Sequence, residues 1–350
     1  MEENGSVVRE NYKKFPYEII NVDEATKKRL MTLFKGPFFT SIKVGPEKWS
    51  MPAIYEETAD ILYNFPAFSD DIYISTYPRS GTTWTQEMIW LLCNDLNYEA
   101  AKATPLTTRF PFLEMESLAP KNDAINEEMK NLLPKPALDI LSEVTSGRLI
   151  KTHLPIKLMP YDALEKRCKI VYVARNPADV VVSLYHFNRN PAMMYAGSFQ
   201  QFVDLFLEDL PTWSPFFEHI KDGWNRRNES NVLFLFYEDL VVDLEKSLKK
   251  LAAFLEKPLK DDDLPELMQH LNIKNFKQNS SVNHEFLAKF ATENWEFIRQ
   301  GGVGSNPEMT PQIMEKIEEW TDRQLSGTDL KFPHKLRHKI NLYKMQVSKQ

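Results

Sequence analysis

The sequence lacks the features that mark secreted, membrane-spanning or metal-binding proteins. Its 350 residues include only two cysteines, Cys93 and Cys168, which provide neither a disulfide framework nor a metal-ligand spacing. It contains no apolar run of about eighteen residues or more, and its first residues, Met1 to Gly5, lack the basic-then-apolar order of a signal peptide. We therefore expect a cytoplasmic protein without a membrane partner.

An excess of basic residues is also missing. The chain has 43 Lys and Arg against 49 Asp and Glu, which gives a formal net charge of −6. Nucleic-acid-binding proteins usually show a basic face, so we expect no nucleic-acid partner, and local cations would have to hold any anionic ligand. The chain also has no internal repeat and no low-complexity linker. We expect one domain over residues 15–340, with flexible tails at residues 1–14 and 341–350.

Four short apolar, β-branched-rich runs predict buried strands, at about residues 72–76, 149–152, 170–174 and 232–236. Stretches with helical spacing separate these runs, so the order predicts an α/β fold with a central parallel sheet flanked by helices. Ligands of such sheets bind at the carboxyl ends of the strands. A polar candidate follows each predicted strand, in chain order Arg79, His153, Arg175 and Tyr237.

Residues 72–84 predict a strand, a tight loop and the start of a helix, which together form an anion site. The loop carries, in order, Arg79, Ser80, Gly81, Thr82 and Thr83. Its hydroxyls and the free N–H groups of the helix can bind phosphate oxygens, while the glycine lets the backbone approach a ligand closely. A simple surface turn is the alternative, but the flanking strand and helix favour a phosphate loop. A threonine pair replaces the Lys and the magnesium-binding hydroxyl of an ATP-type loop, so we expect no metal.

The second constellation ends the predicted strand at residues 149–152. Lys151 and His153 are two residues apart, which places both side chains on the same face of an extended chain. A histidine can take a proton from an acceptor hydroxyl while a lysine stabilises charge on the transferred group. A hydrogen-bonded structural histidine is the alternative, and the nearby phosphate-type loop favours the functional interpretation.

The third constellation is again a strand, a turn and a helix, over residues 170–183. Arg175 follows the strand, an Asn-Pro pair marks the turn, and Ser183 lies eight residues further on, about two turns into the helix. The Arg fork and the hydroxyl could converge on a second phosphate. Taken in isolation, they would be a surface arginine and a helical serine. Two anion loops and a histidine indicate a ligand with two well-separated phosphates.

These motifs resemble those of the cytosolic sulfotransferases, whose donor is 3′-phosphoadenosine 5′-phosphosulfate (PAPS). The resemblance spans roughly residues 38–330, and residues 94–101 and 233–239 are similar to the insect-type subgroup that includes a retinol dehydratase. Further segments that match the family are Pro111-Phe112-Leu113-Glu114, Phe236-Tyr237-Glu238-Asp239 and Phe297-Ile298-Arg299-Gln300-Gly301.

The resemblance implies a P-loop-like fold and a role for each matching residue. His153 would be the general base, Lys151 would hold the sulfuryl oxygens, and Arg79, where the family has Lys, would contact the oxygen between phosphorus and sulfur. The implied catalytic set is His153, Arg79, Lys151 and Ser183. The implied donor site comprises Arg79, Ser80, Gly81, Thr82, Thr83 and Trp84 on the 5′-phosphate and adenine side, with Arg175, Ser183, Tyr237, Arg299, Gln300 and Gly301 on the 3′-phosphate and adenine side.

Several positions depart from the family pattern. Arg79 replaces a point charge by a planar fork. Gln300 removes a cation near the 3′-phosphate, and Asn272-Ile273 stands where the family has Ser-Phe, which removes an aromatic ring from the nucleotide pocket. Of the family's dimer motif only Thr310 and Glu315 remain, so the dimer motif is degenerate, although a homodimer stays possible.

Aromatic and Met-rich segments suggest a small, mostly apolar acceptor such as a phenol, steroid or retinoid, although each could equally be core packing. The segments contain Phe110, Phe112, Met115, Phe187, Met193, Met194, Tyr195 and Phe199. The sequence thus predicts a sulfotransferase that moves the sulfuryl group from PAPS to a hydroxyl by in-line transfer, without a metal. Two alternatives stay open: a dehydratase that acts through a sulfonated allylic alcohol, and a non-catalytic PAPS- or lipid-binding protein.

Overall fold

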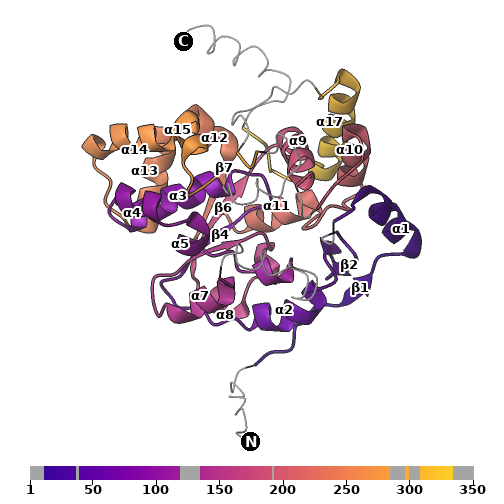
Figure 1. The fold of residues 1–350 in the computed structure, drawn as a ribbon, viewed down its shortest axis with the longest axis horizontal. Coiled ribbons are helices and arrows are strands. Elements are labelled where there is room, and N and C mark those ends of the chain that lie inside the picture. The colour runs from indigo at the N-terminus through magenta and orange to yellow at the C-terminus, as the bar shows by residue number, and fades with distance from the viewer. Residues whose placement is uncertain are drawn as a thin grey trace, which may run out of the picture.

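A four-stranded parallel sheet with the order β5-β4-β6-β7 forms the centre of the computed structural model (Figure 1). The structure describes residues 12–36, 39–118, 135–190, 193–283, 296–298 and 308–333. The strands are β4 (Ile72–Ser75), β5 (Leu149–Thr152), β6 (Lys169–Ala174) and β7 (Val232–Phe236). All four strands predicted from the sequence, and their parallel arrangement, are confirmed. In register, Ser75 pairs with Thr152 on one side and with Tyr172 on the other, so these carboxyl ends lie side by side.

Both faces of the sheet are buried, because successive side chains along each strand enter opposite cores. Tyr73 and Tyr172 belong to one hydrophobic cluster, and Ile74 and Val173 to the other. Helices α3 (Thr82–Cys93), α13 (Leu244–Leu255) and α14 (Leu264–Leu271) contribute to the second cluster. The first cluster includes residues of α9 (Pro177–Asn188), α10 (Phe199–Leu207), α11 (Phe216–Asn225) and α17 (Pro311–Leu325).

Shorter elements complete the fold (Figure 1). The remaining described helices are α1 (Glu24–Leu33), α2 (Tyr55–Tyr63), α4 (Tyr98–Ala103), α5 (Leu106–Arg109), α7 (Ala137–Glu143), α8 (Tyr161–Glu165), α12 (Tyr237–Val242) and α15 (Ile273–Gln278), with the 3₁₀ turns η1 (Met115–Ser117), η3 (Ile156–Leu158) and η4 (Asp261–Asp263). A small antiparallel sheet, which the sequence analysis did not predict, is formed by β1 (Ile19–Asn21), β2 (Ile42–Val44) and β3 (Trp49–Met51). Its strands have three residues each, which is too short for a clear alternating pattern.

A buried ion pair fixes the amino-terminal edge of the central sheet. Arg148, directly before β5, donates from Nε to Asp71 Oδ1, directly before β4, at 2.9 Å. Both residues are buried, and the same guanidinium donates to the Pro66 carbonyl. Breaking a buried pair of this kind typically costs about 3–5 kcal/mol. The pair therefore helps to hold the register that places the strand ends together at the opposite edge.

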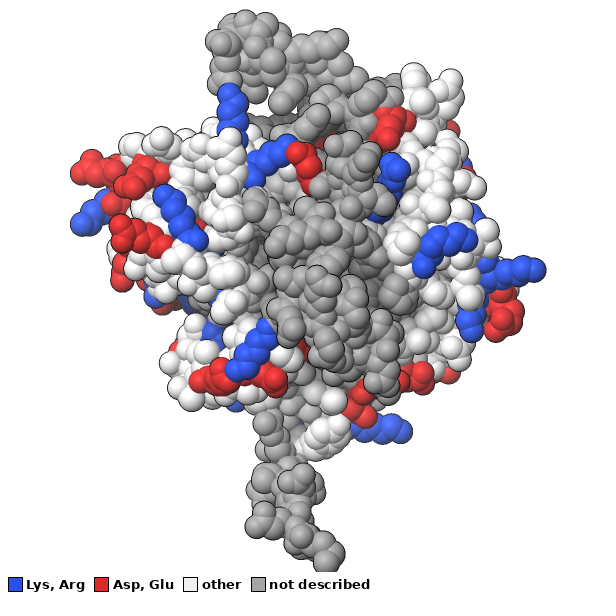
Figure 2. Space-filling view, viewed as in Figure 1, with Lys and Arg blue, Asp and Glu red and all other residues white. Residues whose placement is uncertain are grey.

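The surface of the molecule carries charges of both signs. Figure 2 shows Lys and Arg side chains interspersed with Asp and Glu side chains over the described surface of one face. Within the described ranges, no helix is both long enough and apolar enough to cross a membrane. The same ranges contain no cluster of three or more His, Cys, Asp or Glu side chains that could hold a metal ion.

Candidate active site

The loop between β4 and α3 has two residues in the left-handed region of the backbone. Arg79 and Gly81 both have positive φ, 68° and 98°. For Arg79 this left-handed conformation costs about 1–2 kcal/mol, and a functional site is where such strain commonly occurs. A Cβ added to Gly81 would lie 2.5 Å from Cδ2 of Tyr237, so only glycine fits beneath that ring.

The same loop presents unsatisfied donors. Ser80 is fully buried, and its Oγ has no hydrogen-bond partner among the described residues. Helix α3 begins at Thr82 without a side-chain cap, so its first N–H groups are also available to a ligand. Buried polar groups are normally paired, and an anion at a helix N-terminus would pair these. The loop therefore fits a phosphate group, as its sequence predicts.

His153 follows β5 and is held with its Nδ1 toward Thr76. The Nδ1 atom lies 2.8 Å from the Thr76 carbonyl oxygen. Because a carbonyl can only accept, Nδ1 carries the proton and Nε2 keeps its lone pair. The Thr76 hydroxyl lies 3.2 Å from Nδ1 and 2.6 Å from Oγ1 of Thr82, which joins the histidine to the start of α3. This tautomer is the one that a general base acting through Nε2 requires.

Two neighbouring groups have lowered pKa values with different consequences. Burial lowers the pKa of His153 well below its ordinary value, and the charge on Lys151 lowers it further. Burial also lowers the pKa of Lys151, to about 8, although the Glu114 carboxylate opposes that shift. The imidazole is therefore neutral at neutral pH while most of the ammonium remains charged, which suits a proton acceptor beside a charge stabiliser. The Lys151 Nζ lies 4.1 Å from the centre of the Phe112 ring, a cation–π contact.

The Glu114 carboxyl accepts two hydrogen bonds from the end of β5 and the residue after it. Its Oε1 accepts the His153 backbone N–H at 2.6 Å, and its Oε2 accepts the Thr152 hydroxyl at 2.8 Å. The segment before it pairs with β5, since the Lys151 N–H donates to the Pro111 carbonyl and the Leu113 N–H donates to the Lys151 carbonyl. The carboxyl is 1% exposed, and burial raises its pKa to about 7. The sequence analysis quoted Glu114 only within a matching motif and assigned it no role.

A second histidine, which the sequence analysis missed, supports the first. His219 on α11 is fully buried and lies with Nε2 2.8 Å from the His153 carbonyl oxygen, so Nε2 carries its proton. Its Nδ1 then accepts from the Tyr172 hydroxyl at 2.6 Å. Burial lowers the pKa of His219 to about 4. No local pattern marks this residue, because the bond joins positions 66 residues apart.

The predicted anion residues of β6 and α9 meet the first loop. Arg79 donates from Nε to Ser183 Oγ at 3.0 Å, and Arg175 donates from Nη1 to the Arg79 carbonyl at 3.0 Å. The Arg175 guanidinium also lies 4.3 Å from the centre of the Tyr237 ring. That ring in turn meets Trp84 edge to face, at 6.0 Å between centres. The structure thus brings five predicted donor-site residues into one connected cluster.

Arg79 makes further contacts on the same side of the site. Its Nη2 donates to the Phe297 carbonyl at 2.9 Å. The guanidinium carbon lies 5.1 Å from the ring centres of both Phe187 and Phe297. The planar fork makes these two bonds from separate nitrogens, Nε to Ser183 and Nη2 to Phe297, whereas a lysine would have to make both from one ammonium nitrogen.

Some predicted residues are not brought into a described contact. Thr83 is half-buried at the start of α3. Arg299, Gln300 and Gly301 lie outside the described residues, as do Ser305 to Pro307. Asn272 caps α15 by accepting the Lys274 N–H, and Ile273 is 40% exposed.

Two rings line the His153 imidazole. Phe112 lies 5.1 Å away and Trp213 lies 5.2 Å away between ring centres, both edge to face. Of the predicted acceptor segments, Phe112 therefore lies beside the predicted base, His153. Phe110, Tyr195 and Phe199 are buried in the hydrophobic clusters, the core-packing alternative. Trp213 was missed, because it lies in a loop with no recognisable motif.

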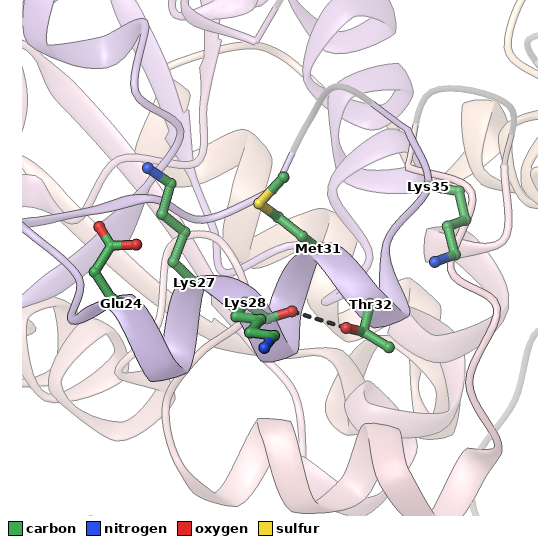
Figure 3. A pocket seen from close by; sticks show the side chains of 6 residues that line it. All are labelled: Glu24, Lys27, Lys28, Met31, Thr32 and Lys35. Atoms are coloured by element: carbon green, nitrogen blue, oxygen red, sulfur yellow. Dashed lines mark hydrogen bonds between the residues drawn. The ribbon is translucent and has the colours of Figure 1, made fainter.

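A surface hollow elsewhere does not involve the site. It has a volume of about 610 Å³ and lies along α1, lined by Glu24, Lys27, Lys28, Met31, Thr32 and Lys35 (Figure 3). None of these side chains belongs to the predicted site. Figure 3 also shows the Thr32 hydroxyl bonded to the Lys28 carbonyl within the helix, an ordinary local contact.

Comparison with known proteins decides the family. The family described as "Sulfotransferase domain" matches residues 69–329. The chain belongs to this sulfotransferase family. Luciferin sulfotransferase from Photinus pyralis is 33% identical over 84% of this chain and 82% of its own length. Sulfotransferase 1E1 from Bos taurus is 34% identical over 78% of this chain and 89% of its own length. Both the resemblance and the fold class predicted from the sequence are confirmed.

Solved sulfotransferase structures share the fold. Retinol dehydratase in complex with androsterone and inactive cofactor PAP superposes with a TM-score of 0.83 at 35% identity, covering 92% of this chain and 99% of that chain. Retinol dehydratase in a complex with retinol and PAP gives the same TM-score at 34% identity, covering 92% and 100%. Membership of the family confirms PAPS as the donor of this sulfotransferase. The buried, unpartnered Ser80 hydroxyl fits such a ligand.

Proposed function

We propose that this sulfotransferase moves the sulfuryl group of PAPS to the hydroxyl of a small, mostly apolar acceptor such as a phenol, steroid or retinoid. The observation that carries this proposal is the orientation of His153. Its Nδ1 donates to the Thr76 carbonyl, so the lone pair that can accept a proton is on Nε2 of a buried, neutral ring. Phe112 and Trp213 beside that ring offer an apolar surface to the acceptor.

His153 acts on the acceptor hydroxyl. The neutral Nε2 accepts the hydroxyl proton as the oxygen becomes nucleophilic, and the bond from Nδ1 to Thr76 stabilises the imidazolium that results. Glu114 and the His219 imidazole hold the histidine backbone from two directions, at 2.6 and 2.8 Å. The ring is therefore oriented before the acceptor arrives, which lowers the entropic cost of the reaction.

The cations act on the transferred group and the donor. When bound, PAPS supplies the sulfuryl group in a transfer that resembles phosphoryl transfer and depends on alignment and charge stabilisation. Lys151 would hold the sulfuryl oxygens. Arg79 and Ser183 are bonded to each other and would join the 5′ and the 3′ ends of the donor site. Arg175 and Ser183 would hold the 3′-phosphate together with Arg299 and Gly301, and Trp84 and Tyr237 the adenine.

The test is transfer of label from ³⁵S-PAPS to phenols, steroids and retinoids, with His153→Ala beside the wild type. General-base catalysis contributes about 10²- to 10⁴-fold, so we expect the variant to lose turnover by that factor. We expect PAP affinity, measured by calorimetry, to stay within about 2-fold, because the lost ring contacts the acceptor and not the nucleotide. His186→Ala is the matched control, since this histidine is bonded to Glu308 and has no described contact with His153. A His153→Ala rate near that of wild type would remove the general-base assignment.

One alternative is favoured by a specific observation. Two solved relatives with a TM-score of 0.83 are retinol dehydratase. A dehydratase outcome would begin with the same sulfuryl transfer to an allylic alcohol and would then lose sulfate. Product analysis with retinol separates the two: labelled sulfate ester indicates the transferase, while a label-free dehydrated product with free sulfate indicates the dehydratase. Tight PAP binding without any product would favour a non-catalytic binding protein.

The proposal includes the organisation of the chain. We infer a single sulfotransferase domain over residues 15–340 in a cytoplasmic protein; the tails predicted at residues 1–14 and 341–350 fall, except for residues 12–14, outside the described part of the chain. Because the Lys13 N–H is bonded to Asn64, limited proteolysis is expected to trim the first tail only up to about that residue. A homodimer would have to form despite the degenerate motif around Thr310, and light scattering of the full chain gives the mass.

A further inference from the structure

Trp213 stands out among the residues around the catalytic histidine. It lies in the loop between α10 and α11, is 5% exposed, and places its indole 5.2 Å from the His153 ring. The Trp213 ring centre also lies 6.4 Å from that of Phe112, so the rings of Trp213, Phe112 and His153 all contact one another. No motif of the sequence points to this position.

The backbone at Trp213 is strained and firmly held. Its φ is 69°, in the left-handed region that bulky residues rarely adopt. The Trp213 N–H donates to the Ser50 carbonyl at 2.7 Å, and the Ser50 N–H donates to the Ser214 carbonyl at 2.7 Å. These two bonds fasten the loop to β3. A large aromatic side chain kept in a costly conformation beside a catalytic base indicates a functional constraint.

The indole also carries an unsatisfied donor. Its Nε1 is buried and has no hydrogen-bond partner among the described residues. Buried indole N–H groups usually find a partner. Trp49 has an unpartnered Nε1 as well, but it lies in the regular strand β3 and has no described ring contact with His153. The combination of strain, contact with the base and an open donor is found at Trp213.

We propose that Trp213 is a specificity-determining residue whose indole N–H donates to a second oxygen of the acceptor. The reacting hydroxyl itself is a poor partner, because a donor at that oxygen would weaken the nucleophile that His153 activates. A carbonyl or hydroxyl elsewhere on the acceptor has no such conflict. The acceptor class is then an apolar alcohol or phenol that carries a second oxygen. This inference rests on the proposed function.

The experiment compares acceptors that differ only in the second oxygen. The pairs are estrone with its 17-deoxy analogue, where the second oxygen is far from the reacting hydroxyl, and 3-methoxyphenol with 3-ethylphenol, where it is near; the reacting hydroxyl is unchanged within each pair. We measure kcat/KM with labelled PAPS, and affinity for the enzyme–PAP complex by calorimetry, for wild type, Trp213→Phe and Trp224→Phe. Trp224 is the matched control, because its Nε1 is bonded to Asp329 at 2.7 Å and its indole has no described ring contact with His153.

We expect wild type and Trp224→Phe to prefer the oxygenated member of at least one pair by about 10-fold, the effect of one buried hydrogen bond. Trp213→Phe should remove that preference by losing activity on the oxygenated member alone, which isolates the pairwise interaction. Equal losses on both members, a preference that survives in Trp213→Phe, or no preference in wild type would overturn the inference.

The experiment distinguishes failure of the proposed function from failure of the inference about Trp213. If no compound is sulfated, the proposed function is lost, while the binding preference in the PAP complex still decides the role of Trp213. If none of the four compounds binds, the inferred acceptor class is wrong. If the Trp213→Phe variant does not fold, benzothienylalanine at position 213 provides the same comparison. This residue has the shape of tryptophan with sulfur in place of the N–H.

Discussion

Replacing Glu114 by glutamine should slow the enzyme by misplacing His153, the proposed general base. The carboxylate accepts two bonds, from the His153 N–H and from the Thr152 hydroxyl. A glutamine oxygen can keep the first bond, but its NH₂ then faces the Thr152 oxygen, which already accepts the Leu154 N–H at 3.0 Å. The Thr152 hydrogen would lose its acceptor. A lost bond to a charged group is worth about 1.5–3 kcal/mol, so kcat/KM should fall about 10- to 100-fold if the loss is felt in the transition state.

The pH dependence separates this role from simple loss of stability. The Glu114 charge raises the pKa of Lys151, which is about 8 in the wild type. Glutamine removes that charge, so the alkaline fall of kcat/KM for the donor should move to lower pH. Because the pKa of Glu114 itself is about 7, the rate difference between wild type and variant should also narrow below pH 7, where the carboxyl becomes protonated. A merely structural residue would shift neither feature.

The pH dependence of the free energy of unfolding provides a second test of Glu114. The folded-state pKa of Glu114 lies above its ordinary value of 4.5. Wild type should therefore lose stability as the pH rises from 4.5 through 7, and the variant should lack this contribution. Glu116→Gln is the control for kcat/KM and its alkaline limb, since Glu116 is a neighbouring carboxyl that accepts the Ala137 N–H instead. Wild-type kcat/KM together with an unshifted alkaline limb in Glu114→Gln would refute the reasoning.

Two further variants test the donor site. Arg175→Ala should weaken PAP binding about 10- to 100-fold with a smaller effect on kcat, because it removes a cation at the second anion element. Calorimetry measures the PAP affinity, and Arg189→Ala, at an exposed arginine, is the control. Unchanged PAP affinity in Arg175→Ala would remove the 3′-phosphate assignment. Gly81→Ala should weaken PAP binding and lower the free energy of unfolding, since its Cβ would meet Tyr237 at 2.5 Å and φ is 98°. Gly327→Ala, with φ at 80° and open space around the new Cβ, isolates the backbone cost of about 1–2 kcal/mol, so an equal effect of both variants would disprove the close approach.

Local patterns were sufficient for the framework of this molecule. The four strands of the central sheet are runs of β-branched and apolar residues followed by turn residues, and all four occur where predicted. Parallel pairing then brings their carboxyl ends to one edge, which is why Arg79, His153 and Arg175 can be grouped from the order of the strands alone. The antiparallel sheet β1-β2-β3 could not be predicted in the same way, because three-residue strands depend on pairing more than on composition.

Local patterns could not predict the residues that support His153, the proposed general base. His153 is held by the Thr76 carbonyl, the Glu114 carboxylate and the His219 ring, which are 77, 39 and 66 residues away in the chain. Only the register of β5 beside β4, and the packing of α11 against the loop after β5, bring these groups to one imidazole. Such partners carry no spacing signal, although each is a polar residue buried at a strand end or a helix face.

Arg79 shows why a residue type at a motif position does not by itself define a contact. The family resemblance predicts a cation at the bridging oxygen, and the charge is indeed retained at this position. In the structure, the guanidinium is bonded to Ser183 and to the Phe297 carbonyl, between two phenylalanine rings. The fork thereby links the loop after β4 to α9, the two elements assigned to opposite ends of the donor. A lysine would carry the same charge on one nitrogen, whereas the guanidinium spreads its donors over a rigid plane, so the substitution changes the way in which the two halves of the site are held together.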